Sequence, residues 1–330
     1  MANMSAIASP LAGLETRDRI ATAVRNGLTA YPKHLPPWLF YDEAGSRLFD
    51  AITGLPEYYL TRTERGILTR NAEAIVAQAA AGMRLRIQEL GAGSAEKTRL
   101  LLRAAVDLQR SVIYEPIDVS ASAIEGAREH IERDIPGAHV VPRVMDYTHG
   151  LALDLDACHC ERRLVLYIGS SIGNFVPEQA ERLLGRVRAS LQQGDCLLLG
   201  VDLVKNEDTL LAAYDDAAGV TAAFNRNLLV RLNREFGANF HLDAFQHRAL
   251  WNGARSRIEM HLESLLPQRV HLPGLEMTVE LRAGETIHTE NSYKYQTGQV
   301  EQMLRRAGFS PDSRWTDGKD WFAVYLGRAA

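Results

Sequence analysis

A glycine-rich turn is the first feature of this sequence that could do chemistry. In IQELGAGSAEKTRLLL, Gly91 and Gly93 directly follow an apolar run and precede a stretch with helical spacing. Glycines in such a turn let the backbone approach a ligand closely, and the N-terminus of the following helix points toward that ligand. The stretch therefore predicts a loop beneath a nucleotide-like ligand.

The turn lacks the features that bind phosphate groups. A dinucleotide loop has the form G-x-G-x-x-G, but the sixth position here is Glu96, whose charge would repel a pyrophosphate. A P-loop requires Gly-Lys followed by Ser or Thr, and no such sequence follows at the required spacing. These departures argue against a dinucleotide and against a nucleoside triphosphate.

Acidic residues stand at the ends of three successive predicted strands. Glu89 precedes the glycine turn, Asp118 ends the next strand, and Asp146 ends the third, followed by Tyr147. Asp118 is placed to bind both hydroxyls of a ribose, Asp146 to bind the adenine amino group, and Tyr147 to flank the ring. One acid at a strand end is usually solvated. Three in succession favour S-adenosylmethionine as the ligand.

Strand and helix patterns alternate from Arg62 onward, which predicts βαβ units and a parallel sheet covered on both faces. We expect a cap on the helix after Asp118 from Ser120 or Ser122. The expected strands are 85–90, 110–119, 139–147, 162–171, 194–204 and 321–329, and the expected helices are 62–80, 94–106, 120–135, 176–192 and 297–309.

The alternation stops after Lys205. Residues 208–237 are mostly helical in pattern, and residues 256–272 and 275–295 predict antiparallel strands because polar and apolar residues alternate. Near the N-terminus, a short amphipathic helix over 17–28 precedes a loop-like segment rich in proline and aromatic residues. We therefore expect a doubly wound domain interrupted by an insertion, which the N-terminal segment joins.

The composition suits an enzyme that acts on small molecules and a neutral binding protein equally well. The 330 residues carry a formal net charge of −4 without a long run of one sign, which argues against a nucleic-acid-binding protein. Neither a membrane span nor a secretory signal is evident, and we expect a cytoplasmic protein.

No metal site is expected. Cys158 and Cys160 have no second ligand pair at zinc spacing, so we expect them and Cys196 to be reduced thiols. Adjacent Asp215 and Asp216 would point to different faces of a helix. The ten histidines show no cluster spacing.

Seven motifs together resemble the histidine Nα-methyltransferases of ergothioneine biosynthesis, and the resemblance runs nearly end to end. It implies a class I, Rossmann-like, S-adenosylmethionine-dependent methyltransferase domain of α/β class, formed by 62–204 plus 294–330. It also implies a second α+β substrate domain, formed by 1–61 plus 205–293. The motifs are LPPWLFYD, LPEYYLTRTE, ELGAGSAEKT, GSSIGNF, AYDDAAGVTAAFNRN, RIEM and TENSYKY.

The resemblance also implies roles for individual residues. It places Tyr41 near the reacting amine, and it implies that Glu290 and Ser292 recognise the imidazole, with Met260 beside the ring. The carboxylate anchors it implies are Tyr58, Asn174 and Tyr214, and the cofactor contacts are Gly91, Lys97, Asp118, Asp146 and Tyr147.

The implied reaction converts L-histidine to hercynine with three molecules of S-adenosylmethionine, and we expect a monomer. Two alternatives stay open: the same chemistry on another amino acid, and a non-catalytic protein that binds S-adenosylmethionine. Glu290 and Ser292 argue against an apolar aromatic substrate because such a substrate would leave both groups unpaired. A nucleic-acid methyltransferase is disfavoured by the charge, and by GSSIGNF standing in place of an N-P-P-Y-type amine clamp.

Overall fold

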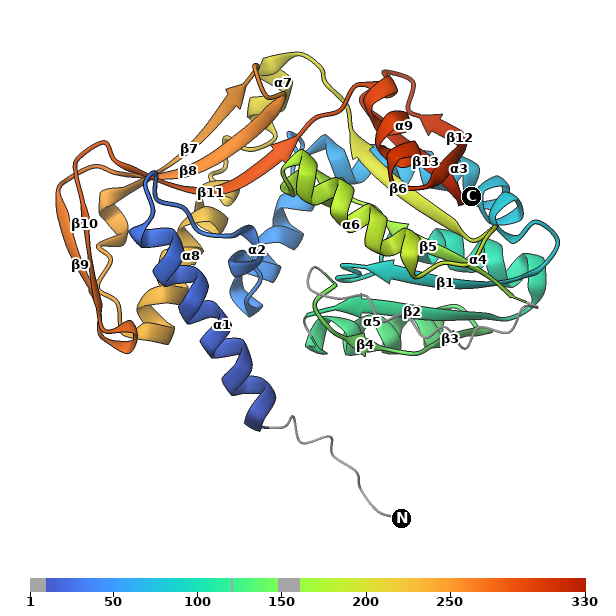
Figure 1. Cartoon of the computed structure of the whole chain (residues 1–330), viewed down its shortest axis with the longest axis horizontal. Helices are drawn as coiled ribbons and strands as arrows, with labels where there is room; N and C mark the ends of the chain where they lie inside the picture. Colours follow the sequence, from blue (N-terminus) through green and yellow to red (C-terminus); the bar gives the residue numbers. More distant parts are fainter. Residues whose placement is uncertain (1–9, 120, 148–160) are drawn as a thin grey trace. The chain divides into compact units, whose positions relative to one another are not determined.

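The computed structural model describes residues 10–119, 121–147 and 161–330. Its contacts divide the chain into two compact units (Figure 1). One combines Met1–Tyr58 with Asn206–Ser292, and we call it the insertion unit. The other combines Tyr59–Lys205 with Tyr293–Ala330, and we call it the sheet unit.

The sheet unit is built on an eight-stranded sheet in the order β12-β13-β6-β5-β1-β2-β3, with β4 beside β2. Only β12 and β13 run antiparallel to their neighbours. The predicted α/β class with a mainly parallel sheet is confirmed. The strands are β1 (Arg84–Leu90), β2 (Val112–Asp118), β3 (Ala138–Val140), β4 (Arg143–Val144), β5 (Glu161–Tyr167), β6 (Cys196–Asp202), β12 (Phe309–Thr316) and β13 (Phe322–Ala329).

Strand order reverses at β1: the chain proceeds to β2 and β3 on one side, and β5 and β6 lie on the other. In open α/β sheets this reversal marks the edge where ligands bind, at the carboxyl ends of the strands. The helices of this unit are α3 (Tyr59–Ala80), α4 (Thr98–Gln109), α5 (Ala121–Asp134), the 3-10 helix η2 (Ser171–Asn174), α6 (Pro177–Ala189) and α9 (Thr297–Arg306).

Apolar packing under α6 and α9 forms a core on one face of the sheet. Both helices supply stripes at 3.6-residue spacing, which bury against alternate residues of β5, β6 and β13. Burial of this area is the main source of stability. The core includes Leu183, Leu184, Val187, Val300 and Leu304 from the helices and Val165, Tyr167, Leu197, Leu199 and Tyr325 from the strands.

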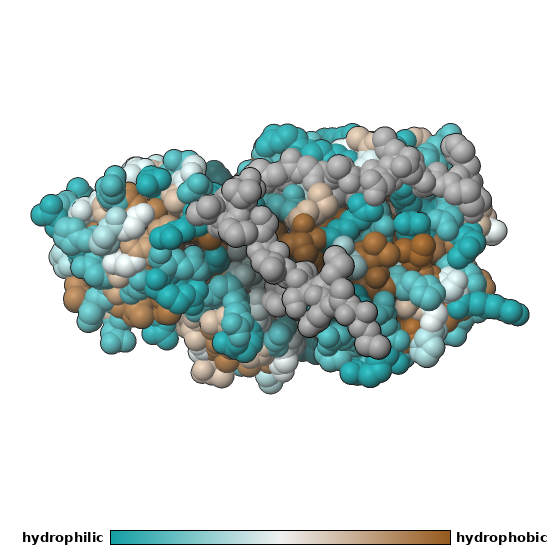
Figure 2. Space-filling view, turned by 90° about the horizontal axis from the view of Figure 1, so that it is seen from below, coloured by the Kyte–Doolittle hydropathy of each residue, from teal (hydrophilic) through white to brown (hydrophobic). Residues whose placement is uncertain are grey.

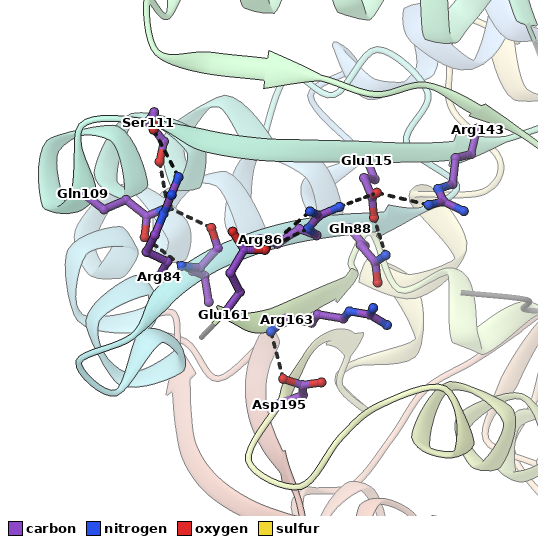
Figure 3. Close-up of polar contacts among 11 residues, drawn as sticks. Arg84, Arg86, Gln88, Gln109, Ser111, Glu115, Arg143, Glu161, Arg163 and Asp195 are labelled. Atoms are coloured by element: carbon purple, nitrogen blue, oxygen red, sulfur yellow. Dashed lines mark hydrogen bonds and ion pairs between the residues drawn. The ribbon is translucent and has the colours of Figure 1, made fainter. Parts of the chain in front are cut away.

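Charged residues replace this apolar packing farther along the same face, over β1 and β2 (Figure 3). Glu115 is almost fully buried and forms ion pairs with Arg86 and Arg143, at 3.0 and 3.2 Å. Gln88, also buried, donates to the second oxygen of Glu115. Buried charges need such partners because an unpaired one would be strongly destabilising.

The insertion unit contains two small antiparallel sheets, β11-β8-β7 and β10-β9. Residues on one face of β7 and β8, such as His247 and Met260, are buried, whereas the opposite face is more exposed. Its elements are α1 (Pro10–Thr29), η1 (Pro37–Phe40), α2 (Glu43–Thr53), α7 (Glu207–Ala212), α8 (Val220–Phe236), η3 (Leu242–Ala244), β7 (Phe245–Asn252), β8 (Arg257–Ser264), β9 (Gln268–Leu272), η4 (Pro273–Leu275), β10 (Met277–Leu281) and β11 (Thr286–Tyr293).

The structure corrects the sequence-based expectation in three places. The segment predicted as loop-like contains α2, which Asp42 caps by accepting a hydrogen bond from Gly45 N at 2.8 Å. The single strand expected over 139–147 is two short strands, because Pro142 has no N–H to continue the ladder. The helical stretch over 208–237 is interrupted between α7 and α8.

Strands β7 and β12 were not predicted. β12 is an edge strand whose pairing with β13 shifts register between Pro311 and Ser313, where proline is tolerated. Cys196, one of the three cysteines expected to be reduced, is a buried thiol. Ser120, the side chain of Ser122, and Cys158 and Cys160 lie outside the described residues.

Hydrophilic residues make up much of the face seen in Figure 2, with hydrophobic residues showing between them. None of the helices in the described ranges combines the length and apolar character needed to cross a bilayer.

Gly200 in β6 lets the sheet approach α3, and its replacement should destabilise the protein. A Cβ at this position would overlap Glu64 Oε1 of α3 and lie 3.3 Å from Ile168 Cα. We expect Gly200→Ala to lower the free energy of unfolding by about 2–3 kcal/mol because the buried Glu64 carboxylate could make way only by giving up its bonds to Gly169 N and Lys97. Urea denaturation measures this loss.

Gly185→Ala is the matched control, since Gly185 lies within α6 and a Cβ there would meet nothing within 4 Å. Alanine in a helix should be neutral or stabilising, by up to ~1 kcal/mol. Equal unfolding midpoints for the two variants would contradict the packing described.

Candidate functional site

The glycine turn follows β1 at the edge where strand order reverses. Gly91 and Gly93 have φ of +70° and +51°, in the left-handed region that favours glycine. Gly91 N donates to Ile117 O at 2.8 Å, and Gly93 N donates to Asp118 Oδ2 at 3.1 Å. The turn is therefore held against the carboxyl end of β2.

Tyr147 also lies against the glycine turn, next to Gly91. Its hydroxyl lies 3.4 Å from where a Cβ on Gly91 would be, and its ring packs edge-on against Tyr167 at 5.8 Å. Burial raises the pKa of Tyr147 to about 12, and the charges of Asp118 and Asp146 add to the shift. Four of the five predicted cofactor contacts thus come together: Gly91, Asp118, Asp146 and Tyr147.

This group of residues fits S-adenosylmethionine better than a phosphate-bearing nucleotide. Its two carboxylates can accept hydrogen bonds from hydroxyl or amino groups but would repel phosphates. Val119 and Val144 are exposed at the ends of β2 and β4 and offer apolar contact to a flat ring.

Glu89 supports the turn from beneath. It is buried and accepts hydrogen bonds from Thr98 Oγ1 at 2.7 Å and from the Tyr114 hydroxyl. Burial raises the pKa of Glu89 to about 7, although both hydrogen bonds act in the opposite direction. The acid that precedes the turn is thus engaged by protein groups.

Lys97, the fifth predicted cofactor contact, pairs with Glu64, a residue that the sequence reasoning missed. Glu64 is fully buried and accepts from Gly169 N at 2.9 and 3.0 Å, so it joins the helix α3 to the loop after β5. It lies within LPEYYLTRTE, but nothing local to that motif indicates a partner 105 residues away.

An aromatic cluster in the insertion unit contains two of the predicted substrate residues and the predicted catalytic one. Tyr58 packs edge-on against Tyr214 with ring centroids 6.2 Å apart. Tyr41, which is 37% exposed, packs against Phe49 at 5.7 Å. The cluster consists of Phe40, Tyr41, Phe49, Tyr58, Tyr214 and Phe224.

The predicted imidazole-binding residues lie on the buried side of β11. The alternation of burial along β11 shifts between Thr289 and Glu290, so that Glu290 and Ser292 are both buried. Ser292 Oγ lies 2.7 Å from the Tyr214 hydroxyl. Thr289 Oγ1 donates to Met260 O at 3.0 Å, which connects β11 to the strand bearing Met260.

A buried network holds the backbone at Tyr214. Asn225 Nδ2 lies 2.8 Å from His247 Nδ1 and also donates to His261 O, so His247 accepts through Nδ1 and donates from Nε2 to Tyr214 O at 2.8 Å. Burial lowers the pKa of His247, which agrees with this neutral tautomer. Asp216 caps α8 by accepting from Val220 N and Thr221 N.

Contrary to expectation, two of the histidines do cluster. His261 and His288 have ring centroids 5.0 Å apart, and Glu259 lies within ligand distance of both. Glu259 already accepts from Arg257 Nε at 2.8 Å and from Asn252 Nδ2 at 2.9 Å. Its charge is therefore balanced by the guanidinium, and the group is a polar network on the outer face of β8 and β11.

Asn174 belongs to the sheet unit, at the end of η2. Gly173 lets η2 approach the backbone of Tyr293, because a Cβ there would lie 2.8 Å from Tyr293 O. The three predicted carboxylate anchors thus come from both units. Their role in binding a substrate stays a prediction, as do the roles of the cofactor contacts.

Gly91→Ala should weaken binding of S-adenosylhomocysteine about tenfold or more. The left-handed backbone costs a residue with a Cβ ~1–2 kcal/mol, and the methyl group would reach Tyr147. Isothermal titration calorimetry measures the change. Gly126→Ala is the control, since Gly126 lies within α5 with open space around it. Equal affinities in the two variants would rule out this turn as the cofactor loop.

Glu89→Gln should flatten the dependence of stability on pH. The folded-state pKa of about 7 exceeds the ordinary 4.5, so the folded protein holds this proton more tightly than the unfolded chain does. The contribution of Glu89 is therefore complete below pH 4.5 and falls as the pH rises through 7, by up to about 3 kcal/mol. Urea denaturation at pH 5 and pH 8 should show a larger loss for the wild type than for the variant; parallel losses would show that Glu89 titrates normally.

Comparison with known proteins, like the geometry of the glycine turn, indicates a protein that uses S-adenosylmethionine. The family described as histidine-specific methyltransferase, SAM-dependent, matches residues 20–329. The histidine N-alpha-methyltransferase of Mycolicibacterium smegmatis is 45% identical over 321 residues, covering 97% of this chain and 98% of that protein. Its counterpart of the same name in Mycobacterium tuberculosis is 43% identical over 303 residues, covering 92% of each chain.

A more distant relative is ergothioneine biosynthesis protein 1 of Neurospora crassa. It is 30% identical over 302 residues, which cover 88% of this chain but only 32% of that protein. With a family match across nearly the whole chain, the resemblance inferred from the seven motifs is confirmed: the chain belongs to the S-adenosylmethionine-dependent, histidine-specific methyltransferase family.

Proposed function

We propose that this protein transfers methyl groups from S-adenosylmethionine to the α-amino nitrogen of L-histidine, three times, to give hercynine for ergothioneine biosynthesis. The observation that carries the proposal is the 45% identity, over 97% of the chain, to a histidine N-alpha-methyltransferase. Glu290 and Ser292, the residues proposed to recognise an imidazole, are both buried, which supports histidine as the substrate.

We assign cofactor binding to the sheet unit. S-Adenosylmethionine supplies a methyl group on a sulfonium, which an amine can attack in line. Asp118 would accept hydrogen bonds from the ribose hydroxyls, and Asp146 would accept one from the adenine amino group. The Tyr147 ring would flank the adenine, while Lys97 and Glu64 hold the loop after β5 in place.

We assign histidine binding to the insertion unit, with Asn174 contributed by the sheet unit. Tyr58, Tyr214 and Asn174 are neutral donors for a carboxylate. A neutral set suits a product that carries a quaternary ammonium, because an arginine in their place would repel it. The aromatic cluster adds ring faces that tolerate such a cation.

The side chain of histidine would be recognised by Glu290 and Ser292, with Met260 beside the ring. A carboxylate and a hydroxyl can bind the two imidazole nitrogens at once. A substrate without those nitrogens would place an apolar side chain against two buried polar groups and make no hydrogen bond to either. This cost favours histidine over an apolar amino acid.

The reaction needs the amine in its neutral form. An α-amine in a peptide has a pKa of roughly 8, and the pKa of a free amino acid is higher. Tyr41 is partly exposed, so it could orient the amine and pass its proton to water. Positioning the nitrogen ~3 Å from the methyl group would supply most of the rate enhancement. A monomeric state, a cytoplasmic location and independence from metal ions stay predictions.

Mass spectrometry of L-histidine incubated with the protein and S-adenosylmethionine tests the proposal. We expect three methyl groups on the α-nitrogen. Methylation of another amino acid instead would keep the chemistry and change the substrate. Binding of S-adenosylmethionine without methylation of any amino acid would leave a non-catalytic binding protein.

Glu290→Ala should lower kcat/KM for histidine by about 1,000-fold, which corresponds to ~4 kcal/mol, and should admit bulkier, apolar side chains. Binding of S-adenosylhomocysteine should not change. Glu280→Ala, which removes an exposed acid from β10 in the same unit, is the control. Unchanged histidine kinetics in Glu290→Ala would overturn the assignment of this residue to the imidazole.

A further inference from the structure

The chain passes between the two units at three places. The boundaries fall between Tyr58 and Tyr59, between Lys205 and Asn206, and between Ser292 and Tyr293. Each crossing has a side chain, on the sheet-unit side and within two residues of the boundary, that contacts Asp202. These side chains belong to Tyr59, Lys205 and Lys294.

The three contacts are short and involve both oxygens of the Asp202 carboxylate. Oδ2 accepts from the Tyr59 hydroxyl at 2.7 Å and pairs with Lys294 Nζ at 2.8 Å. Oδ1 pairs with Lys205 Nζ at 2.6 Å. Lys205 Nζ also donates to the Tyr59 hydroxyl at 2.7 Å, so two of the crossings contact each other as well as the acid.

The backbone of Asp202 adds two further bonds. Its carbonyl accepts from Tyr295 N at 3.0 Å, and its N–H donates to Ser170 Oγ at 2.9 Å. Asp202 ends β6, a fully buried strand, and pairs with Phe322 of β13, so its position is set by the buried centre of the sheet. The three crossings are thus bonded to the end of one buried strand, β6.

Burial makes these contacts strong. The side chains of Asp202 and Lys294 are fully inaccessible, and that of Lys205 is 4% exposed. One carboxylate faces two ammonium groups in a low-dielectric site, where each attraction is far larger than in water. Loss of the carboxylate would leave two buried cations to repel each other.

The crossings lead directly to residues of the proposed histidine site. Tyr58 precedes Tyr59, and Ser292 and Glu290 stand two and four residues before Lys294. We propose that Asp202 is a positioning residue: by holding all three crossings against the end of β6, it fixes the points at which the chain leaves the sheet unit toward the proposed histidine-binding residues. This inference rests on the proposed function of both units.

A role limited to stability would predict something different. Any buried acid of the sheet unit would then matter equally, and every activity would fall together. A positioning role predicts that cofactor binding and histidine binding persist while kcat falls, because a displacement of about 1 Å between reacting atoms can cost ~100-fold in rate.

The test compares Asp202→Asn with Glu115→Gln in the full-length protein. Glu115 is a matched control because it is equally buried in the same sheet and also pairs with two cations, but it lies away from the crossings. For Asp202→Asn we expect kcat for histidine to fall about 100-fold, with KM and the affinity for S-adenosylhomocysteine changed less than about threefold. Glu115→Gln should keep kcat within about threefold.

Hydrogen exchange supplies a readout independent of activity. Amides at 57–61, 203–207 and 292–296 should exchange faster in Asp202→Asn, while those of β1 and β5 keep their protection. If the wild type does not methylate histidine, the proposed function fails, and this exchange pattern still decides whether Asp202 holds the crossings.

Milder variants at the crossings serve if Asp202→Asn does not fold. Tyr59→Phe removes the hydroxyl that contacts Asp202 and Lys205, and Lys205→Met removes the ammonium that contacts Asp202 and Tyr59. Tyr59→Phe and Lys205→Met should each lower kcat by a smaller factor, and Lys294→Arg should retain more activity than Lys294→Met. Wild-type kcat in Asp202→Asn, equal losses of kcat and cofactor affinity, or unchanged exchange at the crossings would each overturn the proposal.

Discussion

A parallel sheet brings the carboxyl ends of its strands to one edge, and the sheet unit depends on this constraint. β1 ends at the glycine turn, β2 ends at Asp118, β5 leads to Gly169, and β6 ends at Asp202. These positions are far apart in sequence, yet hydrogen bonding between neighbouring strands places them side by side. The proposed ligand site, the loop at Gly169 that Glu64 supports and the chain crossings at Asp202 therefore share one edge.

The buried acids near that edge form hydrogen bonds or ion pairs with other groups of the protein. Glu64 binds Gly169 N and Lys97, Glu89 binds Thr98 and Tyr114, and Asp202 binds two lysines. Because a buried charge without partners is costly, each acid fixes the groups around it. The acids nearer the surface, Asp118 and Asp146, stand where they could meet a ligand.

In the insertion unit, the two faces of the sheet β11-β8-β7 carry different sets of residues. Met260, Glu290 and Ser292 are buried, while Glu259, His261 and His288 form the ion-paired network on the opposite side. Alternation along β8 separates these sets, since neighbouring residues point to opposite faces. The shift of burial between Thr289 and Glu290 allows β11 to serve both.

The sequence by itself determined the local features. Alternating strand and helix patterns indicated β1, β2, β5, β6 and their helices, and the glycine turn with its neighbouring acids indicated the ligand edge. The patterns missed β12, whose proline and polar residues suit an edge strand, and α2, whose Asp42 cap stands within a segment dense in proline and aromatic residues. Hydrophobic periodicity is weak in β12, whereas α2 is strongly amphipathic but only 11 residues long, and it directly follows the stretch rich in proline and aromatic residues.

Only the tertiary structure decided which polar groups meet. Glu64 reaches Gly169 across 105 residues, and Tyr59 reaches Asp202 across 143. Likewise, His261 and His288 come together because β8 and β11 are neighbours in the sheet. Periodicity specifies which face of an element is buried, but the partner on that face depends on strand order and packing, which are properties of the whole fold.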